Sequence, residues 1–432
     1  MRHVLFITYY FPPSGGSGVQ RSLKFVKYLP EMDWKVTVLT VLPEFASFPD
    51  LDPALLDEIP PQVTVIKTRS WDPYSIYARM VGKKKTEAVG VGFLGANHTS
   101  FKERLARWVR ANLFLPDARI GWVGYARKEG TKIIQEQSID AIVSTGPPHS
   151  AHLIGSYLSE KGNIPWIADI RDAWPDMAYA EMLPTSSLAK KRDVSIRNRA
   201  LSKARKCIAV TESLKETMAK ATGQEFSVIR NGYDPADMVD LKPITADGFT
   251  IVHTGNMAPA RNPEPIWKVL SEKQRHGKWD DVSIQCVGNV DPSIMTEVHQ
   301  MDVARYVQCI PYVPHAEALR YTVGASLLLL PINRVNDAAG IVTGKIYEYI
   351  ASGRPILGLG DPEGEAADLL NETGAGRMFA YEDTAGVEAY ITDNYEAWLA
   401  GSPLQGANQQ RAAAYSRRTQ TEQLAALLNE IV

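Results

Sequence analysis

Short apolar runs alternate along the chain with stretches in which apolar residues recur every three to four positions. Runs rich in β-branched residues are typical of buried strands, and the longer period is typical of helices with one apolar face. In the first half of the sequence these runs predict strands at 3–10, 35–41, 63–68, 140–145, 166–170, 207–211 and 227–230. The helix expected between the first two strands has its apolar residues at Val19, Leu23, Val26 and Leu29.

A polar stretch at 240–249 contains a proline and a glycine, lacks any periodic pattern, and interrupts this series. A second series of strands follows at 250–253, 283–287, 307–310, 326–330, 355–359 and 377–380, and a last helix carries Leu424, Leu427 and Leu428 on one face. We therefore expect an N-terminal domain over residues 1–239 and a C-terminal domain over 250–415. A helix over 416–432 is expected to return to the first domain.

Strands that alternate with helices form parallel sheets covered by helices on both faces. The predicted fold class is therefore α/β, with two doubly wound, Rossmann-like domains that face a central cleft. Ligands of such sheets bind beyond the carboxyl ends of the strands. The residues that follow each strand are thus the first candidates for chemistry.

Composition narrows the class of protein further. With 47 basic and 49 acidic residues the formal net charge is −2, and the motifs of the common nucleic-acid modules are absent, so we expect no nucleic-acid partner. The three cysteines, Cys207, Cys286 and Cys309, lie in apolar runs without metal or redox spacing, which favours core thiols in a reducing compartment. No apolar run reaches the roughly 20 residues that span a bilayer. We expect a cytoplasmic protein that is soluble or peripherally attached to a membrane.

A glycine-rich turn follows the first strand, with Gly15 and Gly16 directly before a helix. Glycines let the backbone approach a ligand, and the helix start offers unpaired N–H groups to a phosphate or a sugar hydroxyl. A dinucleotide fingerprint is excluded, because Arg21 stands where its third glycine should be. A plain tight turn explains the glycines equally well.

Two further groups follow later strands of the first half. His149 comes after the fourth strand, where a histidine can act as a base or a phosphate ligand near neutral pH. Asp169 and Arg171 lie at the end of the fifth strand and can hold sugar hydroxyls or a phosphate. A structural ion pair that braces the cleft is an equal alternative for this pair.

The second half repeats the glycine-turn arrangement. Gly255 follows its first strand, and Arg261 comes shortly afterwards with a guanidinium suited to a diphosphate. The segment Thr343-Gly344-Lys345 opens a later helix, whose free N–H groups and lysine make a diphosphate cradle. Glu348 lies one turn further, where a carboxylate can accept hydrogen bonds from ribose hydroxyls.

Taken together, these motifs resemble retaining glycosyltransferases of the GT-B fold, family 4 type, such as those of bacterial envelope and exopolysaccharide biosynthesis. Four segments carry the resemblance: PPSGGSGVQR, TGPPHSAHLIG with ADIRDAW, HTGN with ARNPE, and TGKIYEYIASGRPIL. Their order and spacing cover nearly the whole chain. The resemblance implies a hexosyltransferase whose first domain binds an acceptor and whose second binds a nucleotide-diphosphate sugar, with no cofactor and no metal.

The resemblance also implies roles for particular residues. Gly15 and Gly16 match glycines that approach the sugar and the donor phosphate. Arg261 and Lys345 match the basic pair on the diphosphate, and Glu348 matches the carboxylate on the ribose. The pair Tyr312-Val313 matches the segment against which the base rests, and His149 falls near the active-site histidine of some relatives. With Asp169 and Arg171, which the strand ends alone suggest, it makes up the catalytic candidates. The family's acidic pair, spaced E-x7-E, has Gly340 at its first position here, with Asp337 nearby as a substitute.

Two questions stay open from the sequence. Residues 101–115 combine an apolar stripe with four basic residues, and such a helix can lie on an anionic membrane surface or pack on the first domain. A membrane surface would favour a lipid-linked or cell-envelope acceptor over a free sugar. The alternatives to a transferase are a nucleotide-sugar epimerase on the same fold and a non-catalytic binding subunit, which Gly340 favours.

Overall fold

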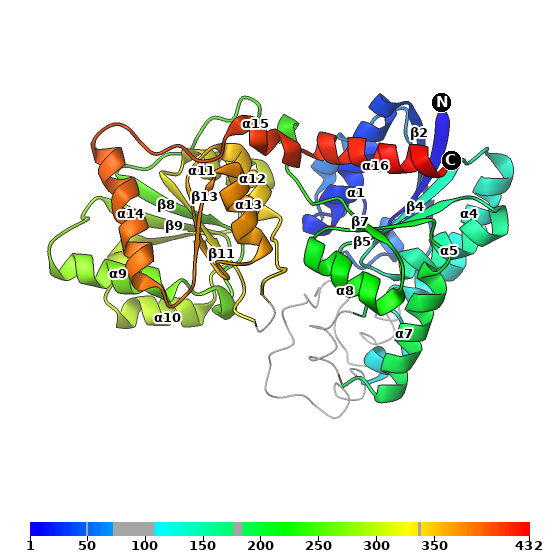
Figure 1. The fold of residues 1–432 in the computed structure, drawn as a ribbon, viewed down its shortest axis with the longest axis horizontal. Coiled ribbons are helices and arrows are strands. Elements are labelled where there is room, and N and C mark those ends of the chain that lie inside the picture. The colour runs from blue at the N-terminus through cyan, green and yellow to red at the C-terminus, as the bar shows by residue number, and fades with distance from the viewer. Residues whose placement is uncertain (49–50, 72–107, 176–183, 336–337) are drawn as a thin grey trace. The chain divides into compact units, whose positions relative to one another are not determined.

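The computed structural model describes residues 1–48, 51–71, 108–175, 184–335 and 338–432. The chain divides into two compact units, one formed by Met1–Arg230 with Gln420–Val432 and the other by Asn231–Thr419. Each unit contains one parallel sheet with helices on both faces (Figure 1). The division falls at Arg230, ahead of the polar stretch at 240–249.

The first unit has a seven-stranded sheet in the order β3-β2-β1-β4-β5-β6-β7. Its strands are β1 (Arg2–Ile7), β2 (Trp34–Val41), β3 (Thr64–Thr68), β4 (Ala141–Gly146), β5 (Trp166–Ile170), β6 (Lys206–Ala209) and β7 (Phe226–Val228). Its helices are α1 (Ser17–Tyr28), α4 (Ile120–Glu136), α5 (Ser150–Gly162), α7 (Ser187–Leu201) and α8 (Glu212–Thr222), with short 3-10 turns η1 (Leu29–Met32), η2 (Pro43–Phe45) and η3 (Pro53–Leu56). The strand order reverses between β1 and β4, the place where open α/β sheets bind ligands.

The second unit has a six-stranded sheet in the order β10-β9-β8-β11-β12-β13. Its strands are β8 (Phe249–Thr254), β9 (Val282–Val287), β10 (Val307–Ile310), β11 (Leu327–Pro331), β12 (Ile356–Leu359) and β13 (Gly376–Phe379). Its helices are α9 (Glu264–Arg275), α10 (Pro292–Gln300), α11 (His315–Gly324), α12 (Lys345–Ser352), α13 (Glu365–Thr373), α14 (Thr384–Leu399) and α15 (Gln409–Ala412), with 3-10 turns η5 (Pro235–Met238), η6 (Pro259–Arg261), η7 (Ala304–Tyr306) and η8 (Ala413–Tyr415). Here the order reverses between β8 and β11.

Both sheets are buried on both faces, which explains why their strands are continuous apolar runs rather than alternating ones. In β1, Leu5 and Ile7 pack on one face while Val4 and Phe6 pack on the other, and all four are fully buried. The four leucines of β11 divide between two cores in the same way. The α/β fold class with two Rossmann-like units is confirmed.

The last helix, α16 (Arg417–Ile431), contributes to the core of the first unit. Leu424 and Leu428 are fully buried there, together with Val19 and Leu23 of α1. The apolar stripe on this helix therefore covers α1, and the first unit is closed by residues from the far end of the sequence.

The strands occupy the expected places, with ends shifted by at most three residues. One expectation about them is wrong. Cys207 and Cys286 are buried, but Cys309 is exposed, because it lies on β10, an edge strand of its sheet. An apolar run alone does not distinguish an edge strand from a central one.

Candidate functional site

The turn after β8 is the centre of the polar site in the second unit. Gly255 has φ of 103°, a conformation that side-chain-bearing residues rarely adopt. Its N–H donates to the Val287 carbonyl at 2.6 Å, which holds the turn against β9. A Cβ at this position would lie 2.6 Å from the Lys345 Nζ, too close for both to stay in place. Glycine is therefore needed for the backbone and for the lysine.

Two basic side chains meet beside this turn. Burial and the charge of Arg261 lower the pKa of Lys345 to about 8, although Glu348 acts in the opposite direction. Arg261 is oriented by its Nε–H, which donates to Asn333 Oδ1 at 2.5 Å, and by a bond of 3.3 Å to the Asn256 carbonyl. Two cations held this close to one another favour a ligand with more than one negative charge.

Helix α12 begins at Lys345 and contributes its N-terminal N–H groups to the same place. Within the described residues the Thr343 hydroxyl, just before this helix, is buried without a hydrogen-bond partner. The helix is fixed to β8 by Tyr349, whose hydroxyl accepts from the Thr254 N–H at 2.9 Å. Burial raises the pKa of Tyr349 to about 12, so this contact stays a neutral hydrogen bond.

Glu348 has a partner that the sequence pattern gave no sign of. The Nε2 atom of His315, the first residue of α11, lies 2.9 Å from Glu348 Oε1. Their positions are 33 residues apart, and no periodic pattern or motif relates them. Of the predicted base-binding pair, Tyr312 is 77% exposed, and Val313 packs against the core of the unit.

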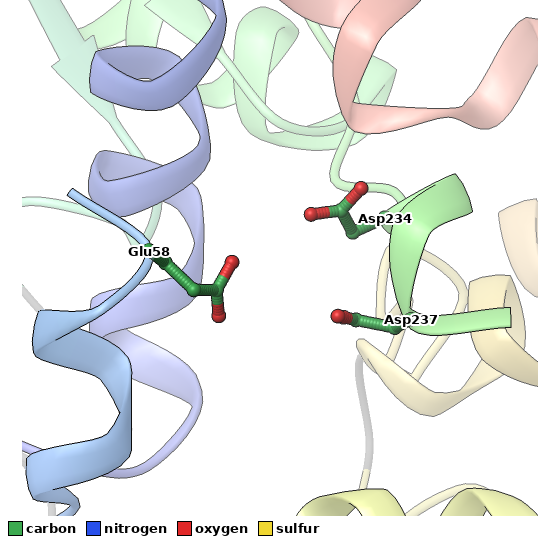
Figure 2. Close-up of side chains that lie close together, drawn as sticks. All are labelled: Glu58, Asp234 and Asp237. Atoms are coloured by element: carbon green, nitrogen blue, oxygen red, sulfur yellow. The ribbon is translucent and has the colours of Figure 1, made fainter. Parts of the chain in front are cut away.

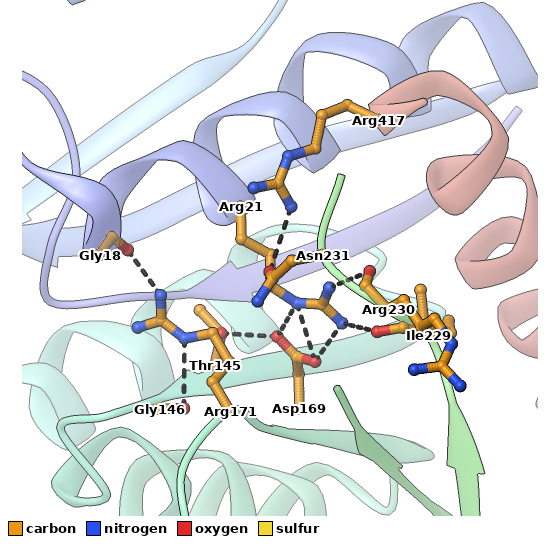
Figure 3. A network of polar contacts seen from close by, with 10 residues as sticks. All are labelled: Gly18, Arg21, Thr145, Gly146, Asp169, Arg171, Ile229, Arg230, Asn231 and Arg417. Atoms are coloured by element: carbon orange, nitrogen blue, oxygen red, sulfur yellow. Dashed lines mark hydrogen bonds and ion pairs between the residues drawn. The ribbon is translucent and has the colours of Figure 1, made fainter. Parts of the chain in front are cut away.

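In the first unit, the turn at Gly15 and Gly16 leads into α1, and Gly16 has φ of 81°. Arg171 holds this turn through its Nη1, which donates to the Gly18 carbonyl at 2.7 Å (Figure 3). The same guanidinium donates to the carbonyls of Gly146 and Pro147. Arg171 therefore links the turns that follow β1 and β4.

Asp169 is engaged in a buried ion pair rather than facing a ligand. It is fully buried and bonds to Arg21, whose Nη2 lies 2.8 Å from Oδ1, and it also accepts from Thr145 at 2.7 Å (Figure 3). Burial would raise the pKa of Asp169, but the Arg21 charge and these hydrogen bonds outweigh it and lower the pKa. This geometry favours the structural alternative for Asp169. In the sequence Arg21 only broke a dinucleotide fingerprint, and no pattern related it to Asp169.

His149 lies directly after β4 and before α5, with 6% of its surface exposed. Its ring stacks on Trp174, with centroids 4.8 Å apart and planes 5° from parallel. The Trp174 Nε1–H donates to Asp193 at 3.0 Å, and burial raises the pKa of Asp193 to about 6. Burial, with the neighbouring His152 and Arg171, holds the pKa of His149 well below 6.5, so its imidazole is neutral at pH 7.

His152 has a structural place behind His149. Its Nδ1 lies 2.8 Å from the Ser144 hydroxyl, and a Cβ on Gly146 would meet its Nε2 at 2.5 Å. Burial lowers the pKa of His152 to about 3. The N-terminus of α5 is capped by Asp117, which accepts from the Ser150 N–H and hydroxyl at 2.8 Å each. This helix start is therefore already satisfied by a carboxylate.

Other acidic residues have anchors within their own units. Glu58, drawn in Figure 2, accepts from Lys24 and Lys27; burial would raise its pKa, but these lysines outweigh it and lower the pKa. Asp234, in the same figure, accepts from the Ala236 N–H at 3.0 Å and caps η5. We interpret both as structural acids.

Some predicted features lie outside the described residues. This holds for Asp337, and for the 101–107 part of the stretch at 101–115. In the described part, residues 108–113 are helical, and Trp108 and Leu113 expose 46% and 62% of their surface. Among the helices that the structure describes, none combines the length and the apolar character needed to cross a membrane.

Comparison with known proteins identifies the fold. No family model matches the chain. No curated protein matches it either. Among solved structures, the chain is similar to sucrose-phosphate synthase from Thermosynechococcus elongatus, with a TM-score of 0.63, 12% identity, and 100% of this chain and 99% of that chain covered.

Two other structures complete the comparison. Anabaena HepE in complex with UDP-glucose matches with a TM-score of 0.60, 14% identity and full coverage of both chains. A Listeria monocytogenes protein assigned as a UDP-N-acetylglucosamine 2-epimerase matches with a TM-score of 0.52 and 10% identity, covering 99% of this chain and 96% of that chain. At these identities the similarity establishes the GT-B type of fold and nothing finer.

Proposed function

We propose that this chain is a glycosyltransferase that moves a sugar from a nucleotide-diphosphate-sugar donor to an acceptor, with retention of anomeric configuration. The observation that carries the proposal is the cation pair Lys345 and Arg261 beside the Gly255 turn, where the strand order of the second sheet reverses. The similarity to HepE, which binds UDP and UDP-glucose, supports a nucleotide-sugar donor.

In this proposal the donor diphosphate lies on Lys345 and Arg261 and on the start of α12, where Thr343 and Gly344 supply a hydroxyl and backbone. Glu348 accepts hydrogen bonds from the ribose, and the base rests against Tyr312 and Val313. The ammonium and guanidinium stabilise the negative charge of the diphosphate, as a divalent metal does in other transferases, so in this proposal the reaction needs neither metal nor cofactor.

The proposed chemistry develops charge on the leaving group. The bond between the anomeric carbon and the phosphate oxygen breaks, and its electron pair stays on the diphosphate, where the two cations stabilise it. The acceptor oxygen forms the new bond on the same face. Its proton passes to the departing phosphate oxygen. Retention follows from attack and departure on one face.

The first unit is proposed to hold the acceptor. Gly15 and Gly16 let the backbone approach the transferred sugar, and neutral His149 offers hydrogen bonds to hydroxyls there. Arg171 is proposed to act through the turns it holds, and Asp169 through the position of Arg21 on α1. The catalytic assignment made from the sequence is thus kept as a proposal for His149, while Asp169 and Arg171 are proposed to take the structural alternative that the sequence left open.

We propose a lipid-linked or cell-envelope acceptor, with peripheral contact at the inner face of the cytoplasmic membrane. Exposed Trp108, Leu113 and Leu188 supply apolar contact area. The segment of Trp108 and Leu113 is tied to the start of α7, because Asn112 bonds to Pro184 and Ser186. Lysine and arginine residues exposed on α7 would attract anionic lipids: Lys190, Lys191, Arg192 and Arg199.

The first test is binding of nucleotides to the whole protein, measured by thermal stabilisation with UDP, GDP, ADP, dTDP, CMP and NAD. A ligand at 100 times its Kd stabilises the native state by roughly 2.7 kcal/mol. We expect one nucleoside diphosphate to stabilise the wild type and to lose its effect in Lys345→Ala.

A glycine pair supplies the matched control. Gly255→Ala forces a Cβ against Lys345, whereas Gly277→Ala strains a left-handed residue (φ 61°) with nothing within 4 Å of the new Cβ. We expect only Gly255→Ala to weaken nucleotide binding, by at least about tenfold. Equal binding by both variants, or stabilisation by NAD alone, contradicts the donor site.

An epimerase is the second candidate, favoured by the match to the Listeria protein. An epimerase would consume the nucleotide sugar without any acceptor. Release of nucleotide diphosphate that depends on an acceptor supports the transferase. Binding of the nucleotide sugar without turnover of any kind would instead support a binding subunit.

A further inference from the structure

The contact between His315 and Glu348 joins two helices that start at the same end of the second unit. His315 is the first residue of α11, and Glu348 lies in the first turn of α12. The two side chains are 41% and 30% exposed, and 2.9 Å separates Nε2 from Oε1. A half-exposed pair of this kind contributes little to the stability of the fold. We therefore interpret the contact as one that orients the Glu348 carboxylate.

Glu348 also has a positively charged neighbour that it does not bind. The charge of Glu348 acts to raise the pKa of Lys345, yet among the described residues the side chain that contacts the Glu348 carboxylate at hydrogen-bond distance is His315. Lys345 and Glu348 are three residues apart on one helix, about 4.5 Å along its axis. Without His315, the carboxylate would be free to swing toward the ammonium and neutralise the cation that the diphosphate needs.

The contact also leaves most of the carboxylate available. A carboxylate offers about four acceptor positions on its two oxygens. His315 occupies one position on Oε1, which leaves Oε2 and the rest of Oε1 for a pair of neighbouring hydroxyls. A ribose presents such a pair, and a 2′-deoxyribose does not.

We propose that His315 is a positioning residue that holds Glu348 for the ribose diol and away from Lys345, and that the donor is therefore a ribonucleoside rather than a 2′-deoxyribonucleoside diphosphate sugar. This inference rests on the proposed donor site and deepens it. A site built to hydrogen-bond a hydroxyl rejects the analogue that lacks it, because its polar group is then left unpaired.

The test compares UDP with 2′-deoxy-UDP by titration calorimetry on the full chain, or the corresponding pair for whichever base the wild type binds. The variants are His315→Ala, His315→Gln and Glu348→Gln. His276→Ala is the matched control, because His276 is also an exposed histidine of the second unit and bonds only to a backbone carbonyl of its own helix.

We expect the wild type and His276→Ala to prefer UDP by about tenfold or more, the effect of one hydrogen bond to a charged group. His315→Ala should lose most of that preference, because its affinity for UDP falls further than its affinity for 2′-deoxy-UDP, which falls only through the approach of Glu348 to Lys345. His315→Gln, whose amide can still donate to Glu348, should recover part of it. Unchanged melting temperatures in the absence of nucleotide show that the variants fold.

Three results would overturn the inference. The first is a wild type that binds the ribo- and deoxyribonucleotides equally or prefers the deoxy form. The second is His315→Ala with the full preference intact, and the third is an equal loss of both affinities. In each case the donor site itself stands, whereas a wild type that binds no nucleoside diphosphate overturns the proposed function as well.

Discussion

At the scale of single residues, Lys345 illustrates a conflict between binding and stability. Its pKa in the native chain is about 8, against an ordinary value of 10.5, because burial and Arg261 disfavour the charged form. Below pH 8 the lysine is charged in both the native and the unfolded chain, and keeping that charge in the native site destabilises the fold. A site that places two cations together to bind a dianion is destabilised by their repulsion when the dianion is absent.

We therefore expect Lys345→Met to be more stable than the wild type at pH 7, by about 1–2 kcal/mol once partial exposure is allowed for. Between pH 8 and 10.5 the native lysine loses its proton before the unfolded one, so the wild type gains stability with rising pH and the difference disappears. Urea unfolding at several pH values measures this. A variant less stable than the wild type at pH 7 would contradict it.

The sequence was least informative about which side chains contact one another. The glycine turns and the basic residues at 261 and 345 could be predicted, because each follows a strand in a parallel sheet. Their partners could not be. Arg21 and Asp169 are 148 positions apart, and Arg261 and Asn333 are 72 apart. Such pairs depend on how helices pack on the sheet, which no local pattern encodes.

At the scale of elements, the connection from β4 to α5 carries two buried, neutral histidines. For both, the native pKa lies below the ordinary value of 6.5 because burial disfavours the charged ring, so the unfolded chain binds protons first as the pH falls. Stability is therefore complete above about pH 7 and decreases below pH 6.5. The ring of His149 stacks on Trp174, and the groups that act on its pKa are His152, Arg171 and the Ala173 backbone.

Between pH 6 and pH 5 the free energy of unfolding of the wild type should fall with pH. Replacing His149 with Gln should reduce that slope by the equivalent of about one proton, or about 1.4 kcal/mol per pH unit. The free energy of unfolding, measured by urea titration at each pH, is the relevant quantity. An unchanged slope would mean that His149 is already protonated in the native protein or that its ring is not buried.

Element boundaries were predicted to within one or two residues except at the end of the first strand, although β1 lies in the middle of its sheet. The first strand was expected to continue to residue 10 but ends at Ile7, after which the chain turns toward Pro12 and Pro13. The apolar pattern of Tyr9 and Phe11 persists past that end because both rings are buried in the turn. Burial, not strand geometry, produced the pattern there.

At the scale of the whole molecule, α16 makes the first unit discontinuous in sequence. Leu424 and Leu428 are fully buried in its core, whereas Leu427 on the same helix is only half-buried. The expectation of a last helix with an apolar face followed from the leucine spacing. That spacing could not distinguish the leucine that is half-buried from the two that are fully buried.

Leu424→Ala should destabilise the first unit by about 2–5 kcal/mol, the usual cost of a cavity in a core. Leu427→Ala should cost about 1 kcal/mol or less. Hydrogen exchange followed by mass spectrometry reads each unit separately, and we expect faster exchange in β1, α1 and α16 for Leu424→Ala only. Equal effects of both variants would show that the helix is held by something other than this core.

The discontinuity also concerns the order in which the chain is made. A ribosome completes the first sheet early, but the segment Gln420–Val432 that closes its core emerges only after all of Asn231–Thr419. At typical rates of synthesis that delay is roughly 10 to 40 s. During this time the α1 side chains that pack on Leu424 and Leu428 lack that cover, which favours binding of the nascent first unit by chaperones, while the second unit can fold as soon as it emerges.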